Sequence, residues 1–175
     1  MKENLLEHDW FPHPLPGNMK IGANSWLYSS FAFLHFRSRL PNAVVIGDHS
    51  GVYNGTFFDL GPQGNVEIGD YCSIVGAIFS SNARIKICDY VFIAHEVTIA
   101  DSAFATPEHQ TQSRSADLSI SNNVWIGARS IILGGVQIGE GAIIGAASLV
   151  DFDVPPETLV AGNPARVVRS LATKP

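Results

Sequence analysis

The chain has 175 residues, of which 46% are hydrophobic and 15% are charged, and its formal net charge is -5. This composition predicts one packed domain and excludes a disordered chain, which would be richer in charge and poorer in apolar residues. Because the chain is acidic and contains no run of basic residues, it would repel a nucleic-acid backbone, and we expect no nucleic-acid partner.

Residues 1–20 are predicted to form an N-terminal segment ahead of the main fold. They mix charges, prolines and histidines where a secretory signal would need an uninterrupted apolar stretch. Throughout the chain, glycines and polar residues interrupt each apolar run before it reaches the roughly 18 residues of a membrane span. We therefore expect a cytoplasmic protein with no membrane span. Cys72 and Cys88 lack the spacing of a metal site and are expected to be reduced packing residues.

A period of six residues organises residues 21–158, which we predict to be a single domain. In the first part of this region, apolar residues recur with that period in four groups separated by short insertions: Ile21, Leu27 and Phe33; Ile46, Val52 and Phe58; Ile68 and Ile74; Ile87, Ile93 and Ile99. Each hexad is predicted to form one very short strand, which can bury its apolar side only by stacking on neighbouring coils.

Several aromatic residues of this first part fall off the inward positions of the period. They are Trp26, Phe31, Phe36 and Phe57. Two interpretations are open for them. They either pack beneath the N-terminal segment or take part in the association of subunits.

A long segment leaves the period after Asp101 and rejoins it near Leu118. It makes the spacing between Ile99 and Ile120 far longer than six residues. The segment reads DSAFATPEHQTQSRSAD, which is polar and contains a proline. Such an excursion, near residues 101–118, is typical of a solvent-facing functional loop.

The C-terminal third carries the period without interruption. Aliphatic residues stand at six successive positions, Ile120, Ile126, Ile132, Ile138, Ile144 and Val150. Four places after each comes a small or β-branched residue: Val124, Ser130, Val136, Ala142, Ser148 and Val154. Both series are predicted to point inward.

Three hexads would make one triangular coil, which gives an all-β fold of about six coils. The coils are expected to begin near Ile21, Ile46, Ile68, Ile87, Ile120 and Ile138. Apolar spacing of three and four, the mark of an amphipathic helix, is missing until the end of the chain. We expect residues 159–175 to form a C-terminal tail with a short helix around Pro164 to Leu171.

The stretch ISNNVWIGARSIILGGVQIGEGAIIGAASLV, followed by AGNPARVVR, resembles the hexapeptide-repeat acyltransferase family. The resemblance runs from Ile68 to Arg169 and implies a parallel β-helix with left-handed coiling, an exception to the usual crossover rule. It also implies a homotrimer that binds acetyl-CoA or another acyl-CoA as co-substrate, with no permanently bound cofactor.

The resemblance places the acyl donor in a groove between neighbouring coils. The positions that match are Trp125, Ala128, Ala146, Asn163, Arg166 and Arg169. Small corner side chains would let the pantetheine arm reach the backbone, the indole would wall the groove, and guanidinium groups would pair with phosphates. A purely structural interpretation also stays open for each of these positions. The small residues would then only fit tight corners, the indole would form a wall between subunits, and the arginines would belong to a solvated tail. Where many relatives have threonine and lysine, this chain has Asp151 and Phe152, so one cationic contact is missing.

The expected catalytic base is absent from its usual position. Related sugar O-acetyltransferases carry a pattern like Asp-Ser-x-aromatic-His at the start of the loop, whereas this chain ends the pattern in Ala105. A base is needed because a neutral acceptor must lose its proton as it attacks the thioester carbonyl, and alanine cannot remove that proton.

Two histidines are candidates for that role. His109 lies on the same loop beside Glu108, with Asp101 as a possible orienting carboxylate; otherwise it is an exposed loop residue without a role. His95 precedes the loop and could face the same cleft, or else form a surface or intersubunit contact.

These observations predict an acetyltransferase that acts on a hydroxyl of a sugar, nucleotide-sugar or polysaccharide, with a histidine as general base. The alternative is a catalytically silent homologue that binds CoA or a partner, which Ala105 favours. A zinc enzyme similar to the γ-class carbonic anhydrases would need three converging histidines. Their spacing is absent from this chain, and we expect no metal.

Overall fold

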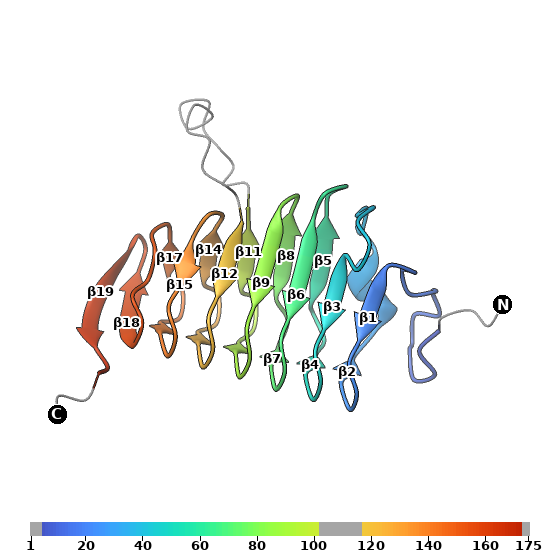
Figure 1. Cartoon of the computed structure of the whole chain (residues 1–175), viewed down its shortest axis with the longest axis horizontal. Helices are drawn as coiled ribbons and strands as arrows, with labels where there is room; N and C mark the ends of the chain where they lie inside the picture. The colour runs from blue at the N-terminus through green and yellow to red at the C-terminus, as the bar shows by residue number, and fades with distance from the viewer. Residues whose placement is uncertain (1–4, 102–116, 173–175) are drawn as a thin grey trace.

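The computed structural model describes residues 5–101 and 117–172, which form three β-sheets side by side along one long axis, with all strands parallel except the last (Figure 1). Each coil of the chain contributes one short strand to each sheet. The chain is therefore a solenoid with three flat sides.

The strands of each sheet follow one another in chain order. The six-stranded sheet contains β1 (Met19–Ile21), β3 (Val44–Ile46), β6 (Asn65–Ile68), β9 (Arg84–Ile87), β12 (Leu118–Ile120) and β15 (Gln137–Ile138). The eight-stranded sheet contains β2 (Trp26–Leu27), β4 (Gly51–Val52), β7 (Ser73–Ile74), β10 (Phe92–Ile93), β13 (Trp125–Ile126), β16 (Ile143–Ile144), β18 (Thr158–Gly162) and β19 (Ala165–Ser170). The five-stranded sheet contains β5 (Phe57–Leu60), β8 (Ile78–Ser81), β11 (Thr98–Ala100), β14 (Ile131–Leu133) and β17 (Leu149–Val150).

The described residues form six coils, and a seventh begins at Val154, which bridges to Ile138, and continues in β18. In coil 1 a short 3-10 helix, η1 (Ser30–Phe33), stands where later coils have a strand of the five-stranded sheet. The first residues predicted for the six coils lie in one register column of the six-stranded sheet: Ile21, Ile46, Ile68, Ile87, Ile120 and Ile138. The predicted left-handed parallel β-helix of about six coils is thereby confirmed.

The core is a narrow column inside the three sheets. Both inward series of the C-terminal third are confirmed, because each of their members is at most 2% exposed. The polar members are accommodated by corner carbonyls: the Ser130 hydroxyl donates to the carbonyl oxygen of Gly145 at 2.9 Å, and that of Ser148 donates to the same oxygen at 2.6 Å. Stacking of successive coils thus satisfies buried hydroxyls as well as burying apolar groups.

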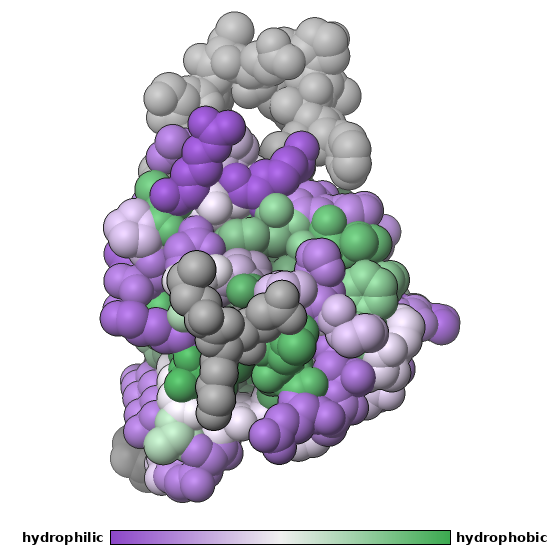
Figure 2. All heavy atoms as spheres, turned by 90° about the vertical axis from the view of Figure 1, so that its right-hand side faces the viewer, coloured by the Kyte–Doolittle hydropathy of each residue, from purple (hydrophilic) through white to green (hydrophobic). Residues whose placement is uncertain are grey.

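The N-terminal end of the column is only partly covered. Ile21 is 37% exposed although it occupies an inward position. The reason is that no coil precedes it, so one of its sides has no stacking partner. Figure 2 looks onto this end and shows apolar side chains at the surface.

The N-terminal segment packs along coil 1. The His8 ring stacks on Trp26 with ring centroids 4.0 Å apart, and its Nε2 bonds the carbonyl oxygen of Leu27 at 2.9 Å. Phe31 packs against Trp10 and Phe11 of the segment and against Phe57 of coil 2, whereas Phe36 packs on Phe33. Packing beneath the segment therefore accounts for Trp26 and Phe31, and Phe57 packs on Phe31.

The prediction of a short C-terminal helix is wrong. β19 runs antiparallel to β18, with Thr158 opposite Ser170 and Gly162 opposite Ala165. The apolar spacing of three and four near the end of the chain favoured a helix, but such spacing describes only local periodicity and does not show which edge the segment can reach. The free edge of β18 offers unpaired backbone groups, and the adjacent tail, with β-branched Val167 and Val168, reaches that edge through a tight turn.

Two further features concern the chain as described. Cys72 and Cys88 are free thiols, and burial raises the pKa of Cys72 to about 11. Within residues 5–101 and 117–172, no helix has the length and apolar character needed to cross a membrane.

Candidate active site

Three predicted site residues fall on one line along the solenoid. We call the turns from the eight-stranded to the five-stranded sheet the second corner. His95, Ala128 and Ala146 take equivalent places there in coils 4, 5 and 6, two residues after the paired Ile93, Ile126 and Ile144. The Arg129 amide donates to the His95 carbonyl oxygen at 2.9 Å, and the Ala147 amide donates to that of Ala128 at 2.8 Å.

The second corner brings successive backbones into close contact. A Cβ atom on Gly127 would lie 2.6 Å from the backbone nitrogen of Ala146, so any larger residue at position 127 would push the two coils apart. Ala128 is half-buried and Ala146 is exposed. A ligand lying along this corner therefore meets backbone and methyl groups rather than bulky side chains.

An apolar wall stands beside this corner on the eight-stranded sheet. Phe92, Trp125 and Ile143 lie in one register column and point outward. The rings of Phe92 and Trp125 are 4.6 Å apart, and Trp125 is 54% exposed. Sequence reasoning named Trp125 but missed Phe92 and Ile143 as members of this wall. The signal was available, because these two residues hold the same hexad position as Trp125.

The predicted phosphate-binding residues lie at the C-terminal end of the wall. Arg169 pairs with Leu159, the residue that continues the column of Ile143, and both Arg166 and Arg169 are exposed. Asn163 and Pro164 form the turn between β18 and β19, with a cis peptide bond between them. The wall therefore runs from Phe92 toward two guanidinium groups.

His95 is exposed on its corner, and its neighbour Glu96 is engaged elsewhere. Glu96 Oε2 accepts from Arg129 Nε at 2.8 Å, and both side chains are largely exposed. The pair crosses from coil 4 to coil 5 beside the line of small residues. Because it is exposed to water, it contributes little to stability.

Asp101 lies on a different corner from His95, since β11 separates the two. Its Oδ2 accepts from the Ser81 hydroxyl at 3.0 Å and from the Asn82 amide. The structure thus does not bring Asp101 and His95 together, and the Asp101 carboxylate is engaged by the turn between β8 and β9.

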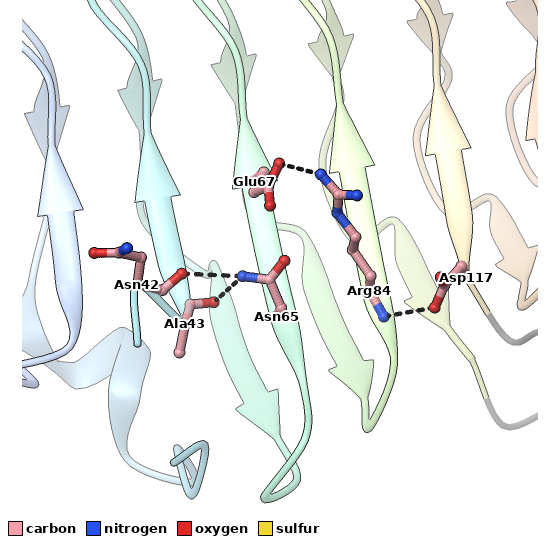
Figure 3. A network of polar contacts seen from close by, with 6 residues as sticks. All are labelled: Asn42, Ala43, Asn65, Glu67, Arg84 and Asp117. Atoms are coloured by element: carbon pink, nitrogen blue, oxygen red, sulfur yellow. Dashed lines mark hydrogen bonds and ion pairs between the residues drawn. The ribbon is translucent and has the colours of Figure 1, made fainter. Parts of the chain in front are cut away.

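The far end of the predicted loop is tied to the same turn. Asp117 Oδ1 accepts from the Arg84 amide at 3.1 Å, and the Arg84 guanidinium bonds Glu67 at 2.7 Å (Figure 3). Hydrogen bonding to Glu67 and its charge raise the pKa of Arg84. The residues flanking 102–116 are therefore held at both ends by the turn of residues 81–84.

The other predicted residues lie outside the described part of the chain. His109, Glu108 and Ala105 all fall within residues 102–116, as does most of the predicted excursion. Over residues 5–101 and 117–172, no group of three or more His, Cys, Asp or Glu side chains is arranged to hold a metal ion.

Comparison with known proteins identifies the family. The model of the bacterial transferase hexapeptide (six repeats) matches residues 117–151. The chain is 33% identical over 134 residues to galactoside O-acetyltransferase of Escherichia coli, covering 73% of this chain and 64% of the relative. It is 33% identical over 151 residues to chloramphenicol acetyltransferase of Agrobacterium fabrum, covering 74% of this chain and 68% of the relative.

Solved structures agree with these relatives. A hexapeptide-repeat acetyltransferase of Vibrio cholerae is 28% identical with a TM-score of 0.62, over 82% of this chain and 79% of the other. Its acetyl coenzyme A complex gives 26% identity and a TM-score of 0.58, over 88% and 72% of the two chains. The chain spans just under two thirds of the galactoside O-acetyltransferase. On these relationships and its stacked hexads, the chain belongs to the hexapeptide-repeat transferase family.

Proposed function

We propose that the chain is an acyltransferase that moves an acyl group, most simply acetyl, from CoA to a hydroxyl of a sugar or nucleotide-sugar. One observation carries the proposal. The corner line of His95, Ala128 and Ala146 runs beside the apolar wall of Trp125 and ends near two arginines. This is the order of groups that an acyl-CoA thioester needs, from reactive carbonyl through amide-bearing arm to phosphates.

The span of this line suits one extended donor. His95 belongs to coil 4, and Leu159, the partner of Arg169, belongs to coil 7. At about 4.8 Å per coil, three coils cover roughly 14 Å. The pantetheine arm would lie along the corner, its amides would meet backbone groups beside Ala128 and Ala146, and the guanidinium groups would pair with the phosphates.

The reaction is direct transfer between two bound substrates. The acceptor hydroxyl oxygen attacks the thioester carbonyl carbon while a histidine, His95 or His109, removes its proton. Corner amides would steady the negative charge that develops on the carbonyl oxygen. The carbon–sulfur bond then breaks, and the thiolate of CoA takes up the proton and leaves as the thiol.

A homotrimer would complete the groove. Apolar side chains remain exposed on the flat sides of the solenoid: Ile78 at 38%, Ile131 at 39% and Trp125 at 54%. Packing these faces against neighbouring copies would cover them and wall the donor groove from a second side. Light scattering on the purified protein tests this part of the proposal.

The central test is acceptor-dependent release of the CoA thiol, measured with acetyl-CoA and a panel of sugars together with chloramphenicol. We expect turnover with a sugar, and a loss of at least about 100-fold in one of the variants His95→Gln and His109→Gln. Arg129→Gln, in the same corner, is the matched control. Binding of CoA without thiol release for any acceptor would instead support a silent homologue, and Ala105→His should then raise activity.

A further inference from the structure

A small pocket lies at the second corner of coils 1 and 2, at the opposite end of the corner line from the arginines. It has a volume of about 120 Å³. That is well below the roughly 300–1,000 Å³ of sites that enclose a whole drug-sized ligand. The pocket would hold one ring of a ligand and leave the rest outside. Aromatic side chains dominate its lining: Trp10, Tyr28, Phe31, Tyr53 and Phe57.

The outer edge of the pocket is Trp10, which the N-terminal segment holds in place. Asp9 accepts hydrogen bonds from the Ser29 hydroxyl at 2.7 Å and from the Ser30 amide at 2.6 Å. The Trp10 ring packs against Phe31, with centroids 5.4 Å apart, while Trp10 stays 62% exposed. An aromatic face is therefore presented at the mouth of the pocket by a fixed backbone.

One lining residue carries a buried polar atom that has no hydrogen-bond partner. Thr56 is 4% exposed, and its hydroxyl is the single buried side-chain polar group of the described residues that makes no hydrogen bond. Leaving such a group unpaired is costly, and most buried hydroxyls avoid it. Because this oxygen has almost no exposed surface, a ligand hydroxyl would pair with it once the Thr56 side chain rotates toward the pocket.

The chemistry of the lining selects a neutral ligand. Among the described residues, no charged side chain lines the pocket, so a phosphate, carboxylate or ammonium group placed there would lose water without gaining a counter-charge from them. The aromatic rings suit the apolar face of a pyranose, and Thr56, Ser29 and Asn54 suit its hydroxyl groups.

Between this pocket and His95, coil 3 makes a shorter corner that carries a glycine. That coil turns from Ile74 to Ile78 with one residue fewer than coil 4 uses from Ile93 to Thr98. Its turn contains Gly76, where a Cβ atom would lie 3.1 Å from the Asn54 carbonyl oxygen and 3.8 Å from the Glu96 nitrogen. Gly76 therefore places no side chain of its own between Asn54 and Glu96. At about 4.8 Å per coil, the distance from coil 2 to coil 4 is roughly 10 Å.

We infer that this pocket binds one ring of a neutral oligosaccharide acceptor, so that the next ring lies over Gly76 and presents a hydroxyl near His95. The inference rests on the proposed function, which it deepens by naming the acceptor class and the subsite that selects it. It predicts that disaccharides are better acceptors than monosaccharides, because only they fill the pocket and reach His95 together.

Binding is measured without any reaction, through the fluorescence of Trp10 in the full chain carrying Trp26→Phe and Trp125→Phe. The probes are maltose, cellobiose and lactose, with methyl α-glucoside for comparison. We expect at least one disaccharide to change the fluorescence saturably. Thr56→Val should weaken that binding about tenfold, the effect of one lost hydrogen bond, and should not lower the melting temperature, because no internal bond is lost.

Thr158→Val is the matched control, since Thr158 is equally buried and its hydroxyl donates to the Pro156 carbonyl oxygen at 2.9 Å. It should lower the melting temperature and leave sugar binding unchanged. The inference fails if none of the three disaccharides binds, or if Thr56→Val and Thr158→Val bind sugar equally well. If the protein transfers acyl groups to sugars but sugars do not change the Trp10 fluorescence, the pocket proposal fails and the proposed enzyme activity stands. If sugar binding depends on Thr56 but no acyl transfer occurs, the pocket proposal stands and the proposed enzyme activity fails.

Discussion

The N-terminal and C-terminal coils share one fold but stack different side chains. In the core column that faces the five-stranded sheet, Phe33, Phe58 and Phe79 stack with ring centroids 5.0 and 5.2 Å apart. The same column continues as Ile99, Ile132 and Val150. The hexad position thus decides only which way a side chain points, while the residue type decides what each region of the solenoid can do.

The corners show the same division. At the turn from the six-stranded to the eight-stranded sheet, His49, Tyr71 and Tyr90 form a stack with centroids 5.0 Å apart. In later coils the same place is taken by Asn123 and Gly141. The C-terminal coils keep small corners suited to an extended donor, and the N-terminal coils keep aromatic surfaces suited to a ring.

The largest effect that sharpens this contrast is expected in the core. Phe58→Ala removes the middle ring of the aromatic stack, and we expect it to lower the free energy of unfolding by about 3–5 kcal/mol, because coil spacing is fixed and the cavity cannot close. Ile126→Val, in the regular coils, should cost about 0.5–1.5 kcal/mol. Urea unfolding of both variants checks this, and equal losses would contradict a division between the two regions.

A medium effect is expected at the second corner of the regular coils. Gly127→Ala forces coils 5 and 6 apart at Ala146, so it should cost about 1–3 kcal/mol and weaken CoA binding. Gly17→Ala is the control, because a Cβ atom there meets nothing within 4 Å. Calorimetry of CoA binding on the two variants separates them, and normal binding by Gly127→Ala would mean that the donor does not follow this corner.

The smallest effect concerns the segment that holds Trp10. Loss of water around the Asp9 carboxyl works to raise its pKa, but hydrogen bonds from Ser30, Ser29 and Phe11 outweigh this and lower the pKa from 3.8 to about 2. A lowered folded-state pKa stabilises the protein above about pH 4, and this contribution is lost as the pH falls from 4 to 2.

Asp9→Asn should therefore cost about 1 kcal/mol at pH 6, after allowance for solvent, and almost nothing near pH 2. Asp151→Asn, in the regular coils, serves as the control and should leave that pH dependence unchanged. Thermal unfolding across this pH range makes the comparison. A difference between Asp9→Asn and the unmodified chain that persists at pH 2 would assign the effect to packing rather than to charge.

The sequence predicted the coils well because stacking repeats one local rule. The starts at Ile46 and Ile138 follow from spacing alone, since each hexad meets the same neighbours. The line joining His95 to Ala128 and Ala146 follows from the same register. Features that depend on a single partner were not predictable: the edge that recruits β19, the turn that engages Asp101, and the unpaired hydroxyl of Thr56. None of these repeats with a period of six.

The reversal of direction at β19 bears on how the solenoid avoids growing lengthwise. A stack of parallel strands invites another copy to continue it, because its last strand carries unpaired amide and carbonyl groups in the same orientation. β19 occupies the last place of the eight-stranded sheet and runs the opposite way, so a further coil finds no parallel template there. Its arginines add charge to the free edge, which also disfavours growth into filaments.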